Sequence, residues 1–338
     1  MGKKVLSFLL KIAISVGLMY LVLRRVAPDW GVCAEQMMGA LREGYGWLVG
    51  AMLVSGIAFG ISAWRWKVIL DAHEVGLRYV ETLRLFMVAV FFSQFMPGGL
   101  ATGDVVRSYY VASRTSEKKT EAVATVVVDR VVGLFGIATV IAISLLAGAG
   151  EYVRRCLILI GIAVVGAIGV ILFFHKRVLK RLPFAGWIYE HLPYRESLLR
   201  VYEAFRHYGE HKLVLVVCWV QSAVIQLLLV LAAFCVGHAV GVQATGRQYL
   251  VRMPLVGALS SLPISVGTIG TAEAGYALLF LAGSDPEGYR STVLAFALMM
   301  RVLWLFLGAV GGLVWWVEKG KIQRKVCEEG EEAREDIP

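Results

Sequence analysis

The sequence predicts an all-α polytopic membrane protein with about six full spans and two re-entrant broken helical hairpins, arranged as an inverted repeat. Three observations predict this fold class. The 338 residues are 58% hydrophobic and 17% charged, whereas about a quarter of the residues in a soluble domain are charged. The charges are also clustered, so that long uncharged runs alternate with short basic ones. Finally, one Gly-rich segment in each half of the chain resembles the other.

Six apolar runs are long enough to cross the hydrocarbon core of a bilayer, which takes about 20 residues of helix. In chain order, they are residues 5–23, 47–70, 122–150, 156–174, 213–237 and 291–317. Lys3 and Lys4 before the first run resemble the basic start of a signal peptide. However, Arg24, Arg25 and Pro28 follow that run without a small-residue cleavage site. We therefore interpret the first run as a span.

Two further apolar segments contain residues that break helices. These residues are Pro97, Gly98, Gly99 and Gly103 within 79–103, and Pro254, Pro263, Gly267 and Gly270 within 250–282. A very basic stretch follows the first segment, and basic stretches prefer the cytoplasmic side. The first segment is therefore expected to enter and leave the membrane on the same side. Each segment is predicted to be a re-entrant hairpin.

The distribution of Lys and Arg predicts the orientation. If the N-terminus is cytoplasmic, most of these residues fall in inside loops, including the strongly basic loop 175–212, as the positive-inside rule requires. We expect a multi-pass protein of the cell (cytoplasmic) membrane with both termini in the cytoplasm. Residues 1–321 are predicted to form one transmembrane domain, with inverted halves of about 1–150 and 151–321. Residues 322–338 are predicted to be a charged cytoplasmic tail.

The two broken segments form part of an internal repeat. GGLATGD at 98–104 aligns without gaps to GTIGTAE at 267–273, and each ends in a carboxylate. Downstream, RVVGLFG at 130–136 matches RVLWLFLG at 301–308 with one insertion and nearly the same offset. With three full crossings in each half, the second half is inserted upside down. Inverted repeats are common in secondary transporters, which bind substrates near the midplane at broken helices.

Composition excludes several other classes of protein. The five cysteines show no paired spacing and the six histidines form no metal-binding cluster, so we expect no metal and no cofactor. The net charge of +9 is explained by basic loops that face the cytoplasm and anionic lipid. We therefore expect no nucleic-acid partner. No Walker A sequence is present, so ATP is not the evident energy source.

A few charged residues lie inside or at the edges of the predicted membrane segments, where each costs several kcal/mol unless it is paired, hydrated or bound. They are Asp104, Arg107, Asp129, Arg130, Glu273 and Arg301. The repeat predicts two ion pairs, Asp104 with Arg130 and Glu273 with Arg301. In one interpretation the pairs only lock the hairpins. In the other, the arginines bind an anionic head group, because a guanidinium forms two parallel hydrogen bonds with phosphate.

Four more residues complete the predicted substrate-binding set. Gly98, Gly99 and Gly267 belong to it because Gly-rich turns present free backbone N–H groups to anions. Arg65 ends the second span at the predicted cytoplasmic face. Its neighbours Trp66 and Lys67 are also typical of an interface anchor, so both interpretations of Arg65 stay open.

PGGLATGDVVR (97–107), DR (129–130) and LPISVGTIGTAE (262–273) resemble the signature segments of the lysylphosphatidylglycerol synthetase transmembrane-region family, often called flippase-like proteins. The resemblance extends over residues 5–317 or so. It implies lipid translocation across the cytoplasmic membrane, with the charged residues above at motif positions. Thr268 and Ala272 depart from a frequent Gly and a frequent Arg, which affects head-group choice. Only a short charged tail follows the last span, so we expect no aminoacyl-lipid synthesis.

We therefore expect a flippase- or scramblase-like lipid translocase, without enzymatic activity, that moves an anionic phospholipid or a polyprenyl-linked lipid by alternating access. One alternative is an integral membrane transferase that acts on a lipid carrier, with Asp104, Asp129 and Glu273 as bases or metal ligands. The spacing of these carboxylates along the helices does not favour a metal site. Another alternative is a scaffold for a lipid-synthesising partner enzyme.

Overall fold

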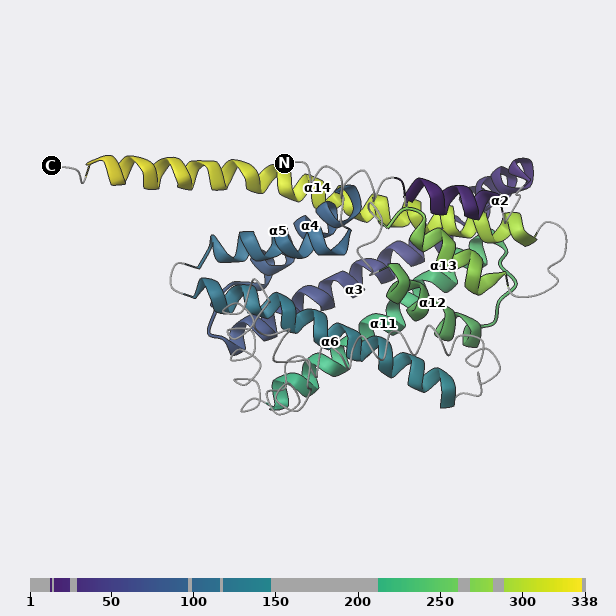
Figure 1. Ribbon diagram of the computed structural model, residues 1–338, viewed down its shortest axis with the longest axis horizontal. Helices are drawn as coiled ribbons and strands as arrows, with labels where there is room; N and C mark the ends of the chain where they lie inside the picture. Colours follow the sequence, from purple (N-terminus) through teal and green to yellow (C-terminus); the bar gives the residue numbers. More distant parts are fainter. Residues whose placement is uncertain are drawn as a thin grey trace, which may run out of the picture.

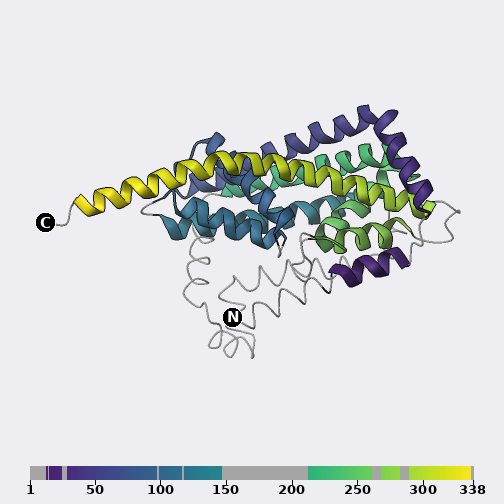
Figure 2. The ribbon, with the colours of Figure 1, turned by 90° about the horizontal axis from the view of Figure 1, so that it is seen from above.

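The computed structural model describes residues 13, 15–24, 29–96, 99–115, 118–146, 212–260, 268–281 and 289–335, and all regular structure in them is α-helical (Figure 1). A short apolar helix, Ser15–Arg24, comes first. The labelled helices are α2 (Trp30–Arg42), α3 (Tyr45–Ala72), α4 (Tyr79–Phe95), α5 (Leu100–Ala112), α6 (Lys119–Leu146), α11 (Lys212–Val240), α12 (Gly246–Ser260), α13 (Thr271–Phe280) and α14 (Tyr289–Glu335). Seen from above, α14 runs along most of the length of the molecule (Figure 2).

Four helices are long and apolar enough to cross a membrane. These are Tyr45–Ala72, Glu121–Ser144, Leu213–Val240 and Tyr289–Val317. At 1.5 Å per residue, a helix of 28 residues such as α3 extends about 42 Å, more than the hydrocarbon core of about 30 Å. Four predicted spans are thereby confirmed as helices of sufficient length. The helix Ser15–Arg24 covers part of the first predicted span, and the predicted span 156–174 lies outside the described residues, so the count of six stays a prediction.

Each predicted hairpin contains two helices that pack against each other. In the first, α4 ends at Phe95 and α5 begins at Leu100, and in the second, α12 ends at Ser260 and α13 begins at Thr271. Pro97, Gly98, Pro263 and Gly267 lie outside the described residues. The broken helices are therefore observed, while their re-entrant course through a bilayer stays a prediction.

The helix starts follow from local sequence. The Asp29 carboxylate accepts hydrogen bonds from the N–H groups of Gly31 and Val32 and so caps α2. After the two breaks, α5 and α13 begin directly after Gly99 and Gly270, whose φ angles are +56° and +85°. Because residues with a side chain rarely adopt positive φ, these glycines determine where each broken helix resumes.

The two halves of the chain pack on each other through paired helices. Helix α3 packs along α11, α4 packs along α14, and α6 packs against α11 and α12. Glycines permit the closest approaches: a Cβ on Gly311 of α14 would lie 2.1 Å from the carbonyl oxygen of Met87 in α4, and one on Gly136 of α6 would lie 2.7 Å from Ser222 Cβ in α11. Small residues at helix crossings are typical of membrane bundles.

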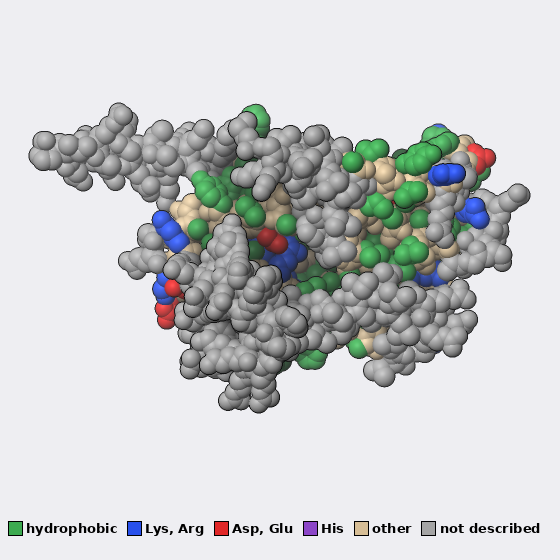
Figure 3. All heavy atoms as spheres, in the orientation of Figure 1, with side chains coloured by type: hydrophobic (Ala, Val, Ile, Leu, Met, Phe, Trp, Pro, Cys, Tyr) green, Lys and Arg blue, Asp and Glu red, His purple; other side chains and the backbone are tan. Residues whose placement is uncertain are grey.

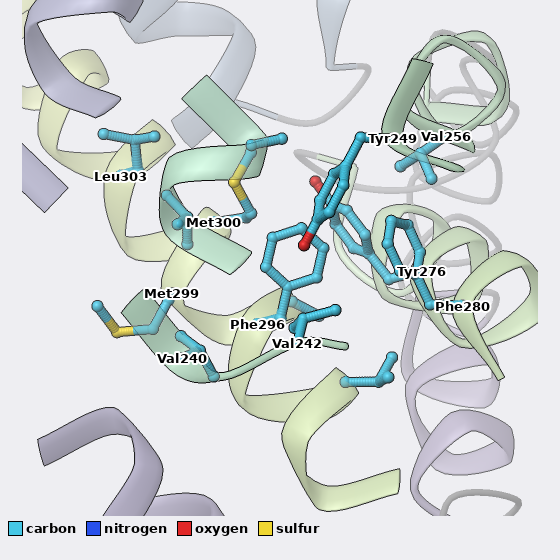
Figure 4. Close-up of a cluster of buried hydrophobic side chains, with 14 of the residues drawn as sticks. Val240, Val242, Tyr249, Val256, Tyr276, Phe280, Phe296, Met299, Met300 and Leu303 are labelled. Atoms are coloured by element: carbon cyan, nitrogen blue, oxygen red, sulfur yellow. The ribbon is translucent and has the colours of Figure 1, made fainter. Parts of the chain in front are cut away.

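Each broken hairpin has its own apolar core. Around the second, aromatic rings meet edge to face, with Phe296 at 5.1 Å from Tyr276 and 6.0 Å from Tyr249 between ring centroids (Figure 4). Around the first, a smaller cluster of buried residues contains Trp66, Leu70, Leu85, Val111 and Val126, among others. These cores hold the helices that carry the charged residues.

Candidate functional site

Two arginines share one buried carboxylate where α3, α5 and α6 meet. Arg65 Nε donates to Asp129 Oδ1 at 2.9 Å, and both terminal nitrogens of Arg107 donate to Asp129 Oδ2 at 3.0 Å. All three residues are buried, with exposed fractions of 8% or less. An unpaired charge at this depth costs several kcal/mol, so the three groups depend on each other.

Neighbouring side chains orient the two arginines. Arg65 Nη1 donates to the hydroxyl of Ser222 in α11 at 2.8 Å. The Arg107 guanidinium lies over the Trp66 ring, 4.5 Å from its centroid, and Trp66 Nε1 donates to Thr125 Oγ1 at 3.0 Å. A cation over an indole face is stabilised by the ring quadrupole. Helix α11 of the second half thus helps to hold a cluster built mainly from the first half.

A third arginine lies at the open edge of the same cluster. Arg130 donates to both oxygens of Asp104, from Nε at 2.6 Å and from Nη2 at 2.8 Å, and Arg107 Nη2 lies 3.6 Å from Asp104 Oδ1. The predicted pair Asp104–Arg130 is therefore confirmed. The side chain of Arg130 is 44% exposed. Figure 3 shows acidic and basic side chains together near the middle of a face whose described side chains are mostly apolar.

We call Arg65, Asp104, Arg107, Asp129 and Arg130 the first charge cluster. Its members come from α3, α5 and α6, and all were predicted as substrate-binding residues. Bidentate and shared contacts of this kind give arginine a fixed orientation. The cluster therefore presents guanidinium donors in fixed orientations. The donors of Arg130 are the most accessible.

The second predicted pair, Glu273 with Arg301, is also confirmed. Arg301 donates to Glu273 Oε1 from Nε at 2.9 Å and from Nη2 at 2.7 Å, and Glu273 Oε2 accepts the backbone N–H of Gly270 at 2.8 Å. Arg301 also donates to Thr268, from Nη1 to Oγ1 at 3.1 Å and from Nη2 to the carbonyl oxygen at 3.0 Å. The pair therefore binds the segment that begins α13, and we call it the second charge pair.

Gly99 and Thr268, which lie next to the two helix starts, are close to each other. A Cβ on Gly99 would lie 3.6 Å from Thr268 Cγ2 and 3.9 Å from Thr268 N. Both residues have positive φ, +56° for Gly99 and +63° for Thr268. They are also aligned positions of the two Gly-rich repeat segments. The contact therefore joins residues that occupy the same place in each half of the chain.

The chain matches a known family over most of its length. The family model described as the lysylphosphatidylglycerol synthase TM region matches residues 8–312. The chain belongs to the lysylphosphatidylglycerol synthase transmembrane-region family. No curated protein compared with the chain matches it. Family membership, together with the four long apolar helices, shows a membrane protein with a lipid-related function.

Sequence analysis did not predict several contacts of the first charge cluster and the second charge pair. It left open an interface-anchor role for Arg65, which is instead buried against Asp129. It assigned no role to Ser222, although a hydroxyl within the apolar run 213–237 was a signal. It treated Thr268 only as a departure from the family pattern. Gly98 and Gly267 lie outside the described residues, so the structure does not place them.

The described part of the chain holds no group of three or more His, Cys, Asp or Glu side chains that could bind a metal ion. The charged side chains that lie close together in these residues are arginines paired with carboxylates. Guanidinium groups are donors without acceptors, and they recognise phosphate and carboxylate groups. Guanidinium groups held in this way are able to recognise anions.

Proposed function

We propose that the protein is a lipid translocase that moves an anionic phospholipid or a polyprenyl-linked lipid across the cytoplasmic membrane by alternating access. The observation that carries this proposal is the proximity of the two broken hairpins, because a Cβ added to Gly99 would lie within van der Waals distance of Thr268. The carboxylate of each hairpin also pairs with an arginine of the following helix. Broken helices that meet between repeats are the usual location of transporter substrate sites.

The pattern of helix packing supports an inverted repeat. The contact between α4 and α14 has a counterpart in the contact between α12 and α6. In the same way, the contact between α5 and α6 has a counterpart in the contact between α13 and α14. These contacts correspond if α3 to α6 of the first half are equivalent to α11 to α14 of the second. The extensive contact of α3 with α11 then joins two equivalent helices. A repeat of this kind gives two related states, one open to each leaflet.

The charges explain why a head group would enter the protein. A polar head group loses its hydration in hydrocarbon at a cost of several kcal/mol. The partly exposed Arg130 offers charge-assisted hydrogen bonds in exchange, and Asp104 holds its guanidinium in a fixed orientation. Phosphate would compete with Asp104 for Arg130 while the acyl chains stay in the bilayer. The proposal therefore needs no water-filled channel wide enough for a whole lipid.

The test is a flipping assay in liposomes with fluorescent anionic lipids and an external quencher. We expect faster flipping with the wild-type protein than in protein-free liposomes, and a loss in Arg130→Ala and Arg301→Ala. Arg42→Gln is the matched control, because Arg42 is exposed in α2 and distant in sequence from both charged groups. Unchanged flipping in both alanine variants would overturn the proposed residue roles.

The same liposomes test the function itself. No flipping of any anionic phospholipid or polyprenyl-linked lipid by the wild-type protein would overturn the translocase proposal. Mass spectrometry of the lipids after incubation with candidate donors and divalent metal ions would detect a covalently modified product. Such a product would favour the membrane transferase instead.

A further inference from the structure

We infer that the two groups of membrane charges have different tasks: the first charge cluster binds the phosphodiester of a lipid with one negative charge, and the second charge pair only clamps the second hairpin. This inference rests on the translocase function proposed above and names the substrate class. It also departs from the symmetry of the sequence repeat, which gives Arg130 and Arg301 equivalent positions.

The charges of the first charge cluster do not balance. The first charge cluster contains three arginines and two carboxylates that are connected by ion pairs. Its other contacts, Ser222, Trp66 and Thr125, are uncharged. The cluster therefore carries one positive charge that no described residue compensates. Since an uncompensated charge is costly away from water, the cluster favours the arrival of one negative charge.

The first charge cluster also contains unused hydrogen-bond donors. A guanidinium has five N–H donors. In the first charge cluster, Arg107 Nε is buried without a hydrogen-bond partner, and Arg130 uses Nε and Nη2 on Asp104 while its side chain stays 44% exposed. The cluster thus offers both charge and an accessible arginine to a ligand.

The second charge pair differs in its net charge, in the exposure of its arginine and in the use of its donors. Arg301 and Glu273 balance each other, and the Arg301 side chain is only 14% exposed. All three guanidinium nitrogens donate within the protein, two of them to Thr268. Glu273 in turn accepts from the backbone of Gly270. The geometry therefore fixes the segment that leads into α13 and leaves no excess charge for a ligand.

The excess of one charge selects the class of head group. A phosphodiester without another charged group carries one negative charge and neutralises the cluster. A zwitterionic phospholipid brings a cation with its phosphate and leaves the excess in place. A phosphomonoester carries about two negative charges above its second pKa of about 6 and makes the balance negative. The preferred ligand is thus a lipid with a single net negative charge on a phosphodiester.

Lipid binding to the purified full chain in neutral detergent, measured by native mass spectrometry, tests this inference. The probes are phosphatidylglycerol, phosphatidylcholine and phosphatidic acid above pH 7, with inorganic phosphate as a competitor. We expect phosphatidylglycerol to bind at least about tenfold more tightly than phosphatidylcholine, the effect of about one charge-assisted hydrogen bond. Arg130→Gln should abolish the preference, whereas Arg42→Gln should keep it.

Two variants separate the tasks of the two groups. Arg301→Gln should keep the phosphatidylglycerol preference while its melting temperature and flipping rate fall. Asp104→Asn adds one more positive charge to the first cluster, so its preference should shift at least about tenfold towards phosphatidic acid. If Asp104→Asn is folded and keeps the wild-type preference, the proposed role of the charge balance is wrong. If Arg301→Gln melts like the wild type yet loses phosphatidylglycerol binding, the clamp assignment fails.

The outcomes also distinguish this inference from the proposed function. Flipping without any charge preference in binding would leave the translocase in place and overturn the first cluster as the selective site. Selective, Arg130-dependent binding without flipping would support the site and overturn translocation. Displacement of the lipid by inorganic phosphate at equal concentration would assign the site to free phosphate and overturn the lipid ligand.

Discussion

Gly99 and Thr268 lie close together although 169 residues of sequence separate them, and each has a positive φ angle. They occupy aligned positions of GGLATGD and GTIGTAE. In an inverted repeat, equivalent residues approach each other only near the axis that relates the halves. The proposed axis therefore passes between the two hairpin breaks. Any movement that opens one hairpin changes this contact.

Substitution of Gly99 tests the importance of that contact. Gly99→Ala should lower the free energy of unfolding by about 1–3 kcal/mol, because an L-residue is strained at φ +56° and ψ −131°. It should change flipping little, since its Cβ would meet Thr268 at an ordinary contact distance. Gly99→Leu carries the same strain and also pushes the breaks apart, so its flipping rate should fall severalfold. Thermal unfolding in detergent and liposome flipping measure the two effects, and equal flipping by both variants would contradict the contact's role.

Thr268 adopts a backbone conformation that favours glycine, at a cost of about 1–2 kcal/mol. Its hydrogen bonds to Arg301 offset that strain. Thr268→Ala keeps the strain and loses the bond to Oγ1, so stability should fall by about 1 kcal/mol. Thr268→Gly loses the same bond but relieves the strain, so it should be more stable than Thr268→Ala. Thermal unfolding of the two variants side by side checks the order, and the reverse order would exclude strain at this residue.

Asp129 is the carboxylate on which the first charge cluster depends. Asp129→Asn leaves Arg65 and Arg107 without their shared partner, and breaking a buried pair typically costs about 3–5 kcal/mol. Asp104→Asn should cost less, because the Asp104 side chain is 24% exposed and water can replace its contacts in part. Chemical or thermal unfolding in detergent measures both. A larger loss in Asp104→Asn than in Asp129→Asn would contradict the central position of Asp129.

The sequence predicted the local arrangement better than the tertiary one. Asp104–Arg130 and Glu273–Arg301 were predictable because each pair joins a hairpin to the next helix, and the repeat shows the same pattern twice. The sharing of Asp129 by Arg65 and Arg107 was not predictable, since it depends on how α3, α5 and α6 are rotated about their axes. In an apolar helix, hydropathy alone does not indicate that rotation.

Hydropathy also does not indicate which helices pack together, so this packing was not predicted from the sequence. Residues 47–64 of helix α3 carry no charge, so their pattern did not show that the helix packs on α11 of the other half. Ser222 acquires its role only through that packing, which brings α11 against Arg65. By contrast, Gly99 and Gly270 act locally through their positive φ angles, so both broken helices were predictable from sequence. The prediction that Gly103 and Pro254 break helices was wrong, because these residues lie inside α5 and α12.

The close contact between α4 and α14 gives the last prediction. A Cβ on Gly311 would lie 2.1 Å from the backbone oxygen of Met87, whereas one on Gly312 would meet the ring of Phe91 at 2.9 Å. The ring can rotate away, but the backbone of α4 cannot yield without moving the helix. Gly311→Ala should therefore lower stability by about 1–3 kcal/mol, the usual cost of overpacking, and Gly312→Ala by less.

This substitution should also slow flipping, because α4 belongs to the first hairpin and α14 carries Arg301. The matched control is Gly56→Ala in α3, where nothing lies within 4 Å of an added Cβ. Alanine is favoured over glycine in a helix by about 1 kcal/mol, so this control should be as stable as the wild type or more so. Thermal unfolding and flipping of the three variants check the order. Equal stability of Gly311→Ala and Gly56→Ala would show that α4 and α14 are not held as closely as described, and the coupling of the first hairpin to α14 would fail with it.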